Sequence, residues 1–328
     1  MSGTPTPPAL WGGVVAFNER NRIAAAIKSL LAQVLPDGSF WMGLTVVVSG
    51  STDGTETIVR ELSERDPRVR LVVQKEREGK SSALAEVFRR AQGDYLILLN
   101  GDACAAPGAV RALLEVAQPP GDRFAVMGRP LPPRGKPGRF SFAISMLWSI
   151  HHSVHATLLA EGSGNHLSDE LMLLPVRELP PLGPGIINDG SFVGGWLSQH
   201  RGELRYAPDA VATISAPRTF REHVRQRRRI VFGHRQIRNE LALEPLTLAR
   251  YARKSPRKAL RILAASTRRT GGILAFATLL AGEAIAGTLA LVDSRSSRQD
   301  HIRWNPIGGH LPDGIGEPAR AGLTAEGS

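Results

Sequence analysis

Residues 95–102 of the sequence read YLILLNGD. Five apolar or aromatic residues in succession are typical of a strand that is buried on both faces of a sheet. An asparagine, a glycine and an aspartate follow at once, as in a turn that ends such a strand, and a helix is predicted over Pro107–Val116. The stretch therefore predicts one strand–turn–helix unit of an α/β protein.

Three similar units precede this one. Their strands are predicted at residues 12–17, 45–48 and 69–73, and each is followed by a polar turn and a helix with apolar residues at helical spacing. Strands that alternate with helices in this way predict a doubly wound, mostly parallel sheet. The polar turns fall at the carboxyl ends of the strands, where such sheets bind their ligands, so we expect the functional site at this edge.

The composition restricts the class of partner. The 328 residues include 41 Lys and Arg against 30 Asp and Glu, a net charge of +11. The basic residues gather at Arg218–Arg238 and Arg250–Arg269, just before an apolar run, which suits a membrane surface better than DNA. With no zinc-finger spacing and no RNA-binding signature, we expect no nucleic-acid partner. The single cysteine, Cys104, excludes an intrachain disulfide and is predicted to be a small buried residue.

The apolar run Gly271–Val292 contains one charged residue, Glu283. Its length just suffices to cross a bilayer, but its small residues and central glutamate leave three other structures open. These are a helix in the plane of the membrane, a hairpin with Phe140–Leu159, and a buried core helix. The flanking arginines and the lack of a signal-peptide pattern predict that the protein lies at the cytoplasmic face of the membrane.

Three polar residues follow predicted strands or begin predicted helices. Asp102 suits a ligand of Mg²⁺ or Mn²⁺, and it suits equally well an Asx turn that caps the next helix. Lys80 suits a phosphate site at a helix start, although a solvated lysine is the simpler interpretation. Asp189 suits a general base, although an N-cap is the simpler interpretation.

Two predicted helices carry further candidates. Arg229 shares a helix face with Arg225 and with Gln226, and such a face can clamp a diphosphate. His151 and His155 also share a face, but without a partner carboxylate we interpret them as polar positions on a half-buried helix. Three loop carboxylates are weak candidates for an acceptor contact: Glu161, Asp169 and Glu170.

One loop has two interpretations. Ser49–Thr55 contains two glycines and several hydroxyls, and its backbone N–H groups could face an anion. A tight turn in which Ser51 or Thr52 caps the following helix is the simpler interpretation.

The order of these motifs resembles that of the family-2 glycosyltransferases of the GT-A fold, most of all their membrane-associated, synthase-like branch. The resemblance covers roughly residues 12–240. It rests on six segments that occur in the family's order: Ala16–Glu19, Ser49–Thr55, Glu78–Lys80, Gly93–Ala103, Asn188-Asp189 and Gln226–Arg229.

The resemblance implies an enzyme that transfers a sugar, with inversion, from a nucleotide-diphosphate sugar to a hydroxyl acceptor. The donor is expected to be a UDP-sugar, and the acceptor lipid-linked, a glycan or a small molecule. Asp102 would hold Mg²⁺ or Mn²⁺, Asp189 would deprotonate the acceptor, and Gln226 and Arg229 would match the family's Gln-x-x-Arg-Trp motif, with Arg229 facing the diphosphate. The residues implied to bind the nucleotide sugar are Phe17, Asn18, Glu19, Ser49, Asp53, Lys80, Gly101 and Asp102.

The sequence departs from the family pattern at four positions. Ser49 and Asn100 stand where the family usually has aspartates, which implies a lost base contact and a weaker metal site. Asn188 replaces a glutamate. Ile230 replaces the tryptophan on which an acceptor sugar stacks, which favours a single-transfer enzyme over a long-chain synthase. These departures motivate one alternative, a catalytically degenerate GT-A protein that binds nucleotide or a partner. A sugar-phosphate nucleotidyltransferase is disfavoured, because Ala16–Asn21 contains no glycine-rich loop.

The same resemblance divides the chain into five parts. Residues 1–10 form a flexible N-terminus, 11–125 a nucleotide-sugar-binding half and 126–245 an acceptor-binding half. Residues 246–295 form a basic connector with an apolar membrane-associated helix, and 296–328 form a flexible tail.

Overall fold

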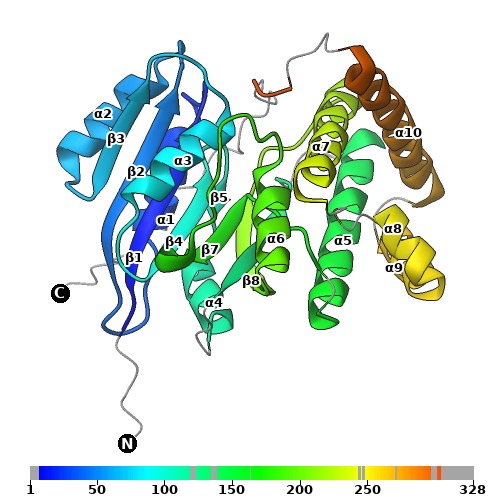
Figure 1. Cartoon of the computed structure of the whole chain (residues 1–328), viewed down its shortest axis with the longest axis horizontal. Coiled ribbons are helices and arrows are strands. Elements are labelled where there is room, and N and C mark those ends of the chain that lie inside the picture. Colours follow the sequence, from blue (N-terminus) through cyan, green and yellow to red (C-terminus); the bar gives the residue numbers. More distant parts are fainter. Residues whose placement is uncertain are drawn as a thin grey trace, which may run out of the picture.

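The computed structural model describes residues 7–118, 123–133, 139–162, 164–242, 245, 248–269, 272–296 and 301–303. Most of both predicted flexible ends, residues 1–6 and 304–328, lies outside this range. One sheet of eight strands forms the centre of the molecule (Figure 1), in the order β3-β2-β1-β4-β7-β6-β8-β5. These strands are β1 (Ala9–Ala16), β2 (Phe40–Ser49), β3 (Val69–Gln74), β4 (Tyr95–Asn100), β5 (Cys104–Ala105), β6 (Phe124–Leu131), β7 (Leu171–Pro175) and β8 (Glu203–Thr213).

The sheet has a parallel half and a mixed half. β3, β2, β1 and β4 run parallel, as the four strand–turn–helix units predict. β7 runs antiparallel to both β4 and β6, while β6 and β8 are parallel and β5 is antiparallel to β8. The α/β fold class is therefore confirmed, while the antiparallel strands β5 and β7 were not predicted from the sequence.

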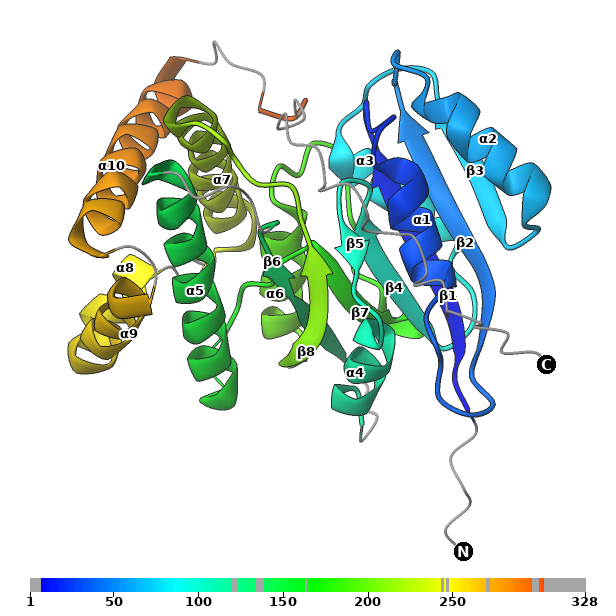
Figure 2. The same ribbon diagram turned by 180° about the vertical axis from the view of Figure 1, so that it is seen from behind.

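Side-chain alternation along the buried strands builds a core on each face of the sheet. In β4, Ile97 and Leu99 pack with α1 (Ile23–Leu31), α2 (Thr55–Arg65) and α4 (Ala109–Val116). Leu96 and Leu98 point the other way and pack with α3 (Lys80–Arg90) and α6 (Asp189–Gln199). The two views show these helices on opposite faces (Figures 1 and 2). Successive strand residues face opposite sides, so a continuous apolar run fits a sheet covered on both faces.

A group of helices covers one end of the sheet (Figure 2). It consists of α5 (Arg139–Ala160), α7 (Phe220–Leu241), α8 (Leu248–Lys254), α9 (Pro256–Arg269) and α10 (Gly272–Ser296). A third apolar cluster joins α5, α8, α9 and α10 through Met146, Tyr251, Ala259 and Leu279. The predicted basic connector is therefore made of two helices, and the predicted apolar run is one long helix.

α10 presents two different faces. Ala275 and Leu279 are buried against α5, whereas Ile273, Leu274, Leu280, Ile285 and Val292 are exposed. By length and composition Gly272–Arg295 is able to cross a membrane, and 28% of its apolar window is buried within the protein. α10 packs against α5, but the two helices do not form the simple hairpin that the sequence left open. Helices α7, α8 and α9 take part in the same packing.

Candidate functional site

A pocket opens at the carboxyl ends of β1, β2 and β4, between the sheet and helices α5, α6 and α7. This is the edge that the strand-end turns predict. Nine of the predicted site residues line the pocket: Phe17, Glu19, Ser49, Lys80, Gly101, Asp102, Asp189, Gln226 and Arg229. The structure therefore brings together side chains from both halves of the chain, while the role of each remains a prediction.

Asn18 and Asp53 lie beside the pocket and hold its loops together. Asn18 adopts a left-handed conformation (φ 54°) in which its backbone N–H donates to Ser51 Oγ at 3.0 Å and its Oδ1 accepts from Thr52 N at 2.9 Å. Asp53 accepts from the backbone N–H groups of Arg20 and Thr55, each at 3.0 Å. Their predicted contact with a nucleotide stays a prediction.

The helix after this loop is not capped by Ser51 or Thr52, as the sequence suggests. Gly54 occupies the N-cap in a left-handed conformation (φ 94°), a backbone geometry that glycine tolerates. Ser51 and Thr52 are instead engaged with the β1 loop at Asn18. The loop therefore supports the neighbouring strand-end turn.

Phe17 is fixed by a cation. The guanidinium of Arg77 lies 3.7 Å from the centre of the Phe17 ring, and both residues line the pocket. A guanidinium stacked on an aromatic face keeps its charge and its remaining donors available at the edge of the ring. Arg77 was not predicted from the sequence, where it is one of several charged residues in a turn.

Asp102 does not cap the next helix. α4 begins at Ala109 with Gly108 as its N-cap, and β5 lies between that helix and Asp102. Asp102 lines the pocket instead, and burial raises the pKa of its carboxyl group against the opposing charges of Arg22 and Lys80. A buried carboxylate is costly unless a cation neutralises it. The helix-cap interpretation of Asp102 is therefore wrong, and its role as a metal ligand stays a prediction.

Glu19 and Arg22 form a buried pair next to Asp102. Arg22 Nη2 lies 2.6 Å from Glu19 Oε2, and Nη1 donates to Ser215 Oγ at 2.6 Å. Burial, together with the charge of Asp102, raises the pKa of Glu19 to about 8 in spite of Arg22. The burial of Glu19 beside the acid Asp102 therefore favours the binding of a further cation at this end of the pocket.

Lys80 joins two acids across the pocket. Its ammonium forms an ion pair with Asp169, and its Nζ lies 3.1 Å from Asp189 Oδ2. The solvated-lysine interpretation is therefore wrong, since the side chain is 18% exposed. Although burial lowers the pKa of Lys80, the two carboxylates raise it further, so the ammonium keeps its proton.

Asp189 is not the N-cap of α6. Asn188 takes that position, and its side chain accepts from Ser191 N at 3.1 Å. Asp189 is 3% exposed and faces Lys80. Burial and the charge of Asp169 raise the pKa of Asp189 to about 6, while Lys80 opposes both effects. A carboxylate with a pKa near neutrality is suited to accept a proton at physiological pH.

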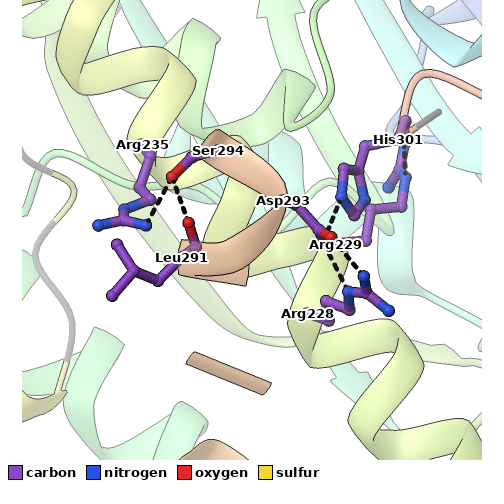
Figure 3. Close-up of polar contacts among 7 residues, drawn as sticks. All are labelled: Arg228, Arg229, Arg235, Leu291, Asp293, Ser294 and His301. Atoms are coloured by element: carbon purple, nitrogen blue, oxygen red, sulfur yellow. Dashed lines mark hydrogen bonds and ion pairs between the residues drawn. The ribbon is translucent and has the colours of Figure 1, made fainter. Parts of the chain in front are cut away.

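Helix α7 turns one face to the pocket. Gln226 and Arg229 line it, whereas Arg225 is exposed, so only the second of the two predicted face-sharing pairs reaches the site. Burial lowers the pKa of Arg229, and the carboxylates of Asp189 and Asp169 oppose the shift. The Arg229 Nε donates to the backbone carbonyl of His301 at 3.1 Å (Figure 3).

The other arginines of this helix bind α10. Arg227 Nε and Nη2 lie 2.5 and 3.0 Å from the two carboxylate oxygens of Glu283. Arg228 pairs with Asp293 through two hydrogen bonds, and Asp293 also lies 2.8 Å from His301 Nε2 (Figure 3). The predicted solvated or lipid-facing basic surface of α7 is therefore in part an internal contact surface.

Residues 13–150 match the family model described as Glycosyl transferase family 2. Over these residues the chain resembles the family-2 glycosyltransferases. The succinoglycan biosynthesis protein ExoO of Rhizobium meliloti (strain 1021) is 31% identical over 113 residues, or 34% of this chain and 31% of that protein. The dolichol-phosphate mannosyltransferase of Saccharomyces cerevisiae (strain ATCC 204508 / S288c) is 30% identical over 102 residues, or 31% of this chain and 38% of that protein. The matched part thus spans about a third of each relative.

A solved structure resembles this chain over a greater length. The mannosyltransferase PcManGT from Pyrobaculum calidifontis, solved in complex with GDP-Man and Mn²⁺, superposes with a TM-score of 0.58 and 21% identity. The match covers 89% of this chain and 88% of that one. It confirms the GT-A type of α/β fold.

The oxygen ligands of this pocket fit a divalent ion in one particular way. In the described part of the chain, no group of three or more His, Cys, Asp and Glu side chains is arranged to hold a metal by itself. Asp102 offers one carboxylate in the pocket, and Asn100 lines it beside this residue. Mg²⁺ commonly binds through one or two carboxylates together with substrate phosphates and water. The residues present therefore fit a metal that arrives with a diphosphate.

Several pocket residues were not among the principal candidates predicted from the sequence. Asp169 lies next to Lys80, and Trp148, His151, His166 and His234 line the far wall. Their segments are far apart in the sequence, and no local pattern marks them. His151 was predicted to be a polar position on a half-buried helix, and the structure adds that this helix faces the pocket.

Proposed function

We propose that this chain is an inverting glycosyltransferase, which moves a sugar from a nucleotide-diphosphate sugar to a hydroxyl acceptor. The observation that supports it most is the position of Lys80, Asp102, Asp189 and Arg229 in one pocket, with acids and cations from both halves of the chain. A diphosphate becomes a good leaving group when cations neutralise its charge, and an acceptor hydroxyl becomes a nucleophile when a base takes its proton.

The proposed reaction is a single displacement. Asp189 takes the proton of the acceptor hydroxyl while the hydroxyl oxygen forms a bond to C1 of the sugar. The bond between C1 and the diphosphate oxygen breaks, and its electron pair leaves with the nucleoside diphosphate. Attack opposite the leaving group inverts C1. Lys80 keeps Asp189 ionised, since its ammonium stands 3.1 Å away, and Arg229 faces the diphosphate.

Asp102 would hold Mg²⁺ or Mn²⁺, and when bound this ion would neutralise charge on the diphosphate. The pKa of Asp102 is raised by burial, and a bound cation would favour its ionised form. The sequence resemblance favours a UDP-sugar, whereas the structural relative PcManGT is described with GDP-Man, so both nucleotides belong in a donor test.

We infer that the chain works at the cytoplasmic face of a membrane, with α10 lying on the lipid surface. α10 is fastened to α7 by the pairs Arg227–Glu283 and Arg228–Asp293 and is packed against α5. A helix that left this contact to cross a bilayer would leave charged side chains without partners. Its exposed apolar residues and the exposed basic residues of the adjacent α9 suit the lipid interface. The exposed basic residues of α9 include Arg257, Lys258, Arg261 and Arg268.

The test is a thermal-shift screen of UDP- and GDP-sugars with and without Mn²⁺, followed by mass spectrometry of products formed on soluble and lipid acceptors. We expect one donor to raise the melting temperature in a Mn²⁺-dependent way and to be turned over. In Asp189→Asn, donor binding should persist while kcat falls about 10²- to 10⁴-fold. Binding without turnover by the wild type would support the degenerate alternative, and no binding of any donor would refute both.

A further inference from the structure

One wall of the pocket is built from rings. Trp148 and His151 of α5 lie with ring centres 5.0 Å apart, and His151 lies 4.3 Å from His155. The series continues through His166, 5.6 Å from His155, to His234 of α7, 5.3 Å from His166. Four of these five rings line the pocket, with His155 buried behind them. Segments far apart in the chain thus form one continuous aromatic surface.

This wall is joined to the proposed base. His166 Nδ1 lies 2.6 Å from Ser191 Oγ, and Ser191 is in the first turn of α6, two residues after Asp189. His166 precedes by three residues Asp169, which shares Lys80 with Asp189. A molecule that rests on the rings is therefore held next to the carboxylate that would take its proton.

The wall is uncharged. Burial lowers the pKa of His151 to about 3 and that of His166 to about 4, and it also lowers the pKa of His234. These imidazoles are neutral at physiological pH, and a neutral imidazole offers one N–H donor and one nitrogen acceptor. Arg227, the cation at this end of the pocket, is occupied by both carboxylate oxygens of Glu283.

These properties select a class of ligand. Aromatic faces pack against the C–H faces of sugar rings, and neutral nitrogen groups pair with hydroxyls. A phosphate-bearing head group would need a free cation here, and the wall has neutral rings instead. The indole N–H of Trp148 and the ring nitrogen Nε2 of His234 are buried without a hydrogen-bond partner in the part of the chain that the structure describes. Hydroxyls of a bound molecule would supply the missing hydrogen bonds to these nitrogens after a small rotation of the rings.

The wall also bears on the missing tryptophan of the Gln-x-x-Arg-Trp motif. Ile230 occupies that position, and it lines the same pocket as Trp148. Trp148 of α5 thus presents an indole to the pocket that Ile230 of α7 also lines.

We propose that Trp148, His151, His166 and His234 form the acceptor subsite, and that this subsite takes an uncharged saccharide whose ring stacks on Trp148 with one hydroxyl directed at Asp189. The subsite rests on the proposed function for its role in transfer, but its ligand binding is measurable independently. Trp148 takes over the stacking surface that Ile230 lacks.

The binding test uses the full chain and two probes, methyl α-D-mannopyranoside and citronellyl phosphate, followed by ligand-observed NMR and tryptophan fluorescence. We expect the glycoside to bind and the prenyl phosphate not to bind at the same concentration. Trp148→Leu should weaken glycoside binding about tenfold or more, and Trp148→Phe, which keeps a ring, should weaken it less. Trp196→Leu is the matched control, because Trp196 stacks on His200 outside the pocket.

A second measurement separates the subsite from the proposed reaction. With a donor that the wild type uses, Trp148→Leu should raise the acceptor KM about tenfold while donor affinity stays unchanged. Unchanged acceptor KM in a folded Trp148→Leu, no glycoside binding by the wild type, or Trp148-dependent binding of the prenyl phosphate would each overturn the proposal. Glycoside binding that depends on Trp148, without transfer from any donor, would support the subsite and contradict the proposed function.

Discussion

The Nε of Arg229 donates a hydrogen bond to the backbone carbonyl of His301 at 3.1 Å, which ties residues 301–303 to the pocket (Figure 3). The ring of His301 is stacked on Phe232 with centres 4.3 Å apart and lies 2.8 Å from Asp293. Ile302 covers the loop before α3, where a Cβ placed on Gly79 would lie 2.8 Å from Ile302 Cγ2. The segment therefore holds the proposed diphosphate cation and touches the helix start that carries Lys80.

Removal of the Asp293 carboxylate should loosen this arrangement. Asp293→Ala leaves the guanidinium of Arg228 and the ring of His301 without their shared acceptor. We expect a loss of about 2–4 kcal/mol in the free energy of unfolding, measured in urea, because a buried cation without its partner is costly. The double variant Arg228→Met/Asp293→Leu should lose less, since no charge is left unpaired.

The same variant should affect the donor. In Asp293→Ala the segment 301–303 would no longer hold Arg229 in place. We therefore expect the donor KM of this variant to be about tenfold higher than that of the control variant Glu240→Ala, which changes an exposed residue. An unchanged donor KM in a folded Asp293→Ala would show that Arg229 is oriented without this segment.

The pH profile of turnover should report the pair Asp169 and Asp189. Asp189 must be ionised to take a proton, so kcat should rise with pH through its raised pKa of about 6 and level off above it. The charge of Asp169 contributes to the raised pKa of Asp189. Asp169→Asn removes this charge, and Lys80 then forms an ion pair with Asp189 alone. The acidic limb of kcat should therefore move to lower pH in Asp169→Asn. A limb that stays in place would contradict Asp189 as the base.

The metal requirement should depend on Asp102. In Asp102→Asn we expect turnover to fall about 10²-fold or more and the stimulation by Mn²⁺ to be largely lost, because the pocket offers no second acid in the Asn100 position. The matched variant Asn100→Asp should bind Mn²⁺ more tightly than the wild type, as judged by thermal shift with donor present. Equal Mn²⁺ dependence in all three proteins would place the metal site elsewhere.

Membrane association should depend on the exposed face of α10. Ile273 and Leu280 are 82% and 54% exposed, so Ile273→Glu/Leu280→Glu should abolish sedimentation with phosphatidylglycerol vesicles and leave the melting temperature nearly unchanged. Leu279→Glu is the contrasting variant, because Leu279 is 5% exposed and packs in the core, where a glutamate should unfold the bundle. Retained vesicle binding by the double variant would contradict the proposed lipid surface.

The four strands of the parallel half, β1 to β4, could be predicted from the sequence because the signal is local. The runs at β2 and β4 contain only residues that fit a sheet buried on both faces, and each ends at a polar turn. Parallel topology then places those turns at one edge, which is why the predictions for Lys80 and Asp102 converge on one pocket. The antiparallel β7 was not assigned, since a buried antiparallel strand and a buried parallel strand have the same apolar pattern.

What the sequence by itself determined was the fold class, the edge of the sheet that carries the pocket, and the resemblance of residues 13–150 to family-2 glycosyltransferases. Tertiary structure decided between the paired interpretations of Asp102, Lys80 and Asp189. A capping residue and a buried charge have the same local sequence, and they differ only in what other segments bring near them. Asp169 beside Lys80, His166 beside His234, and His301 behind Arg229 are pairs of this kind. Burial and Coulomb interactions act through space, so they set the charges of these groups only once the chain is folded.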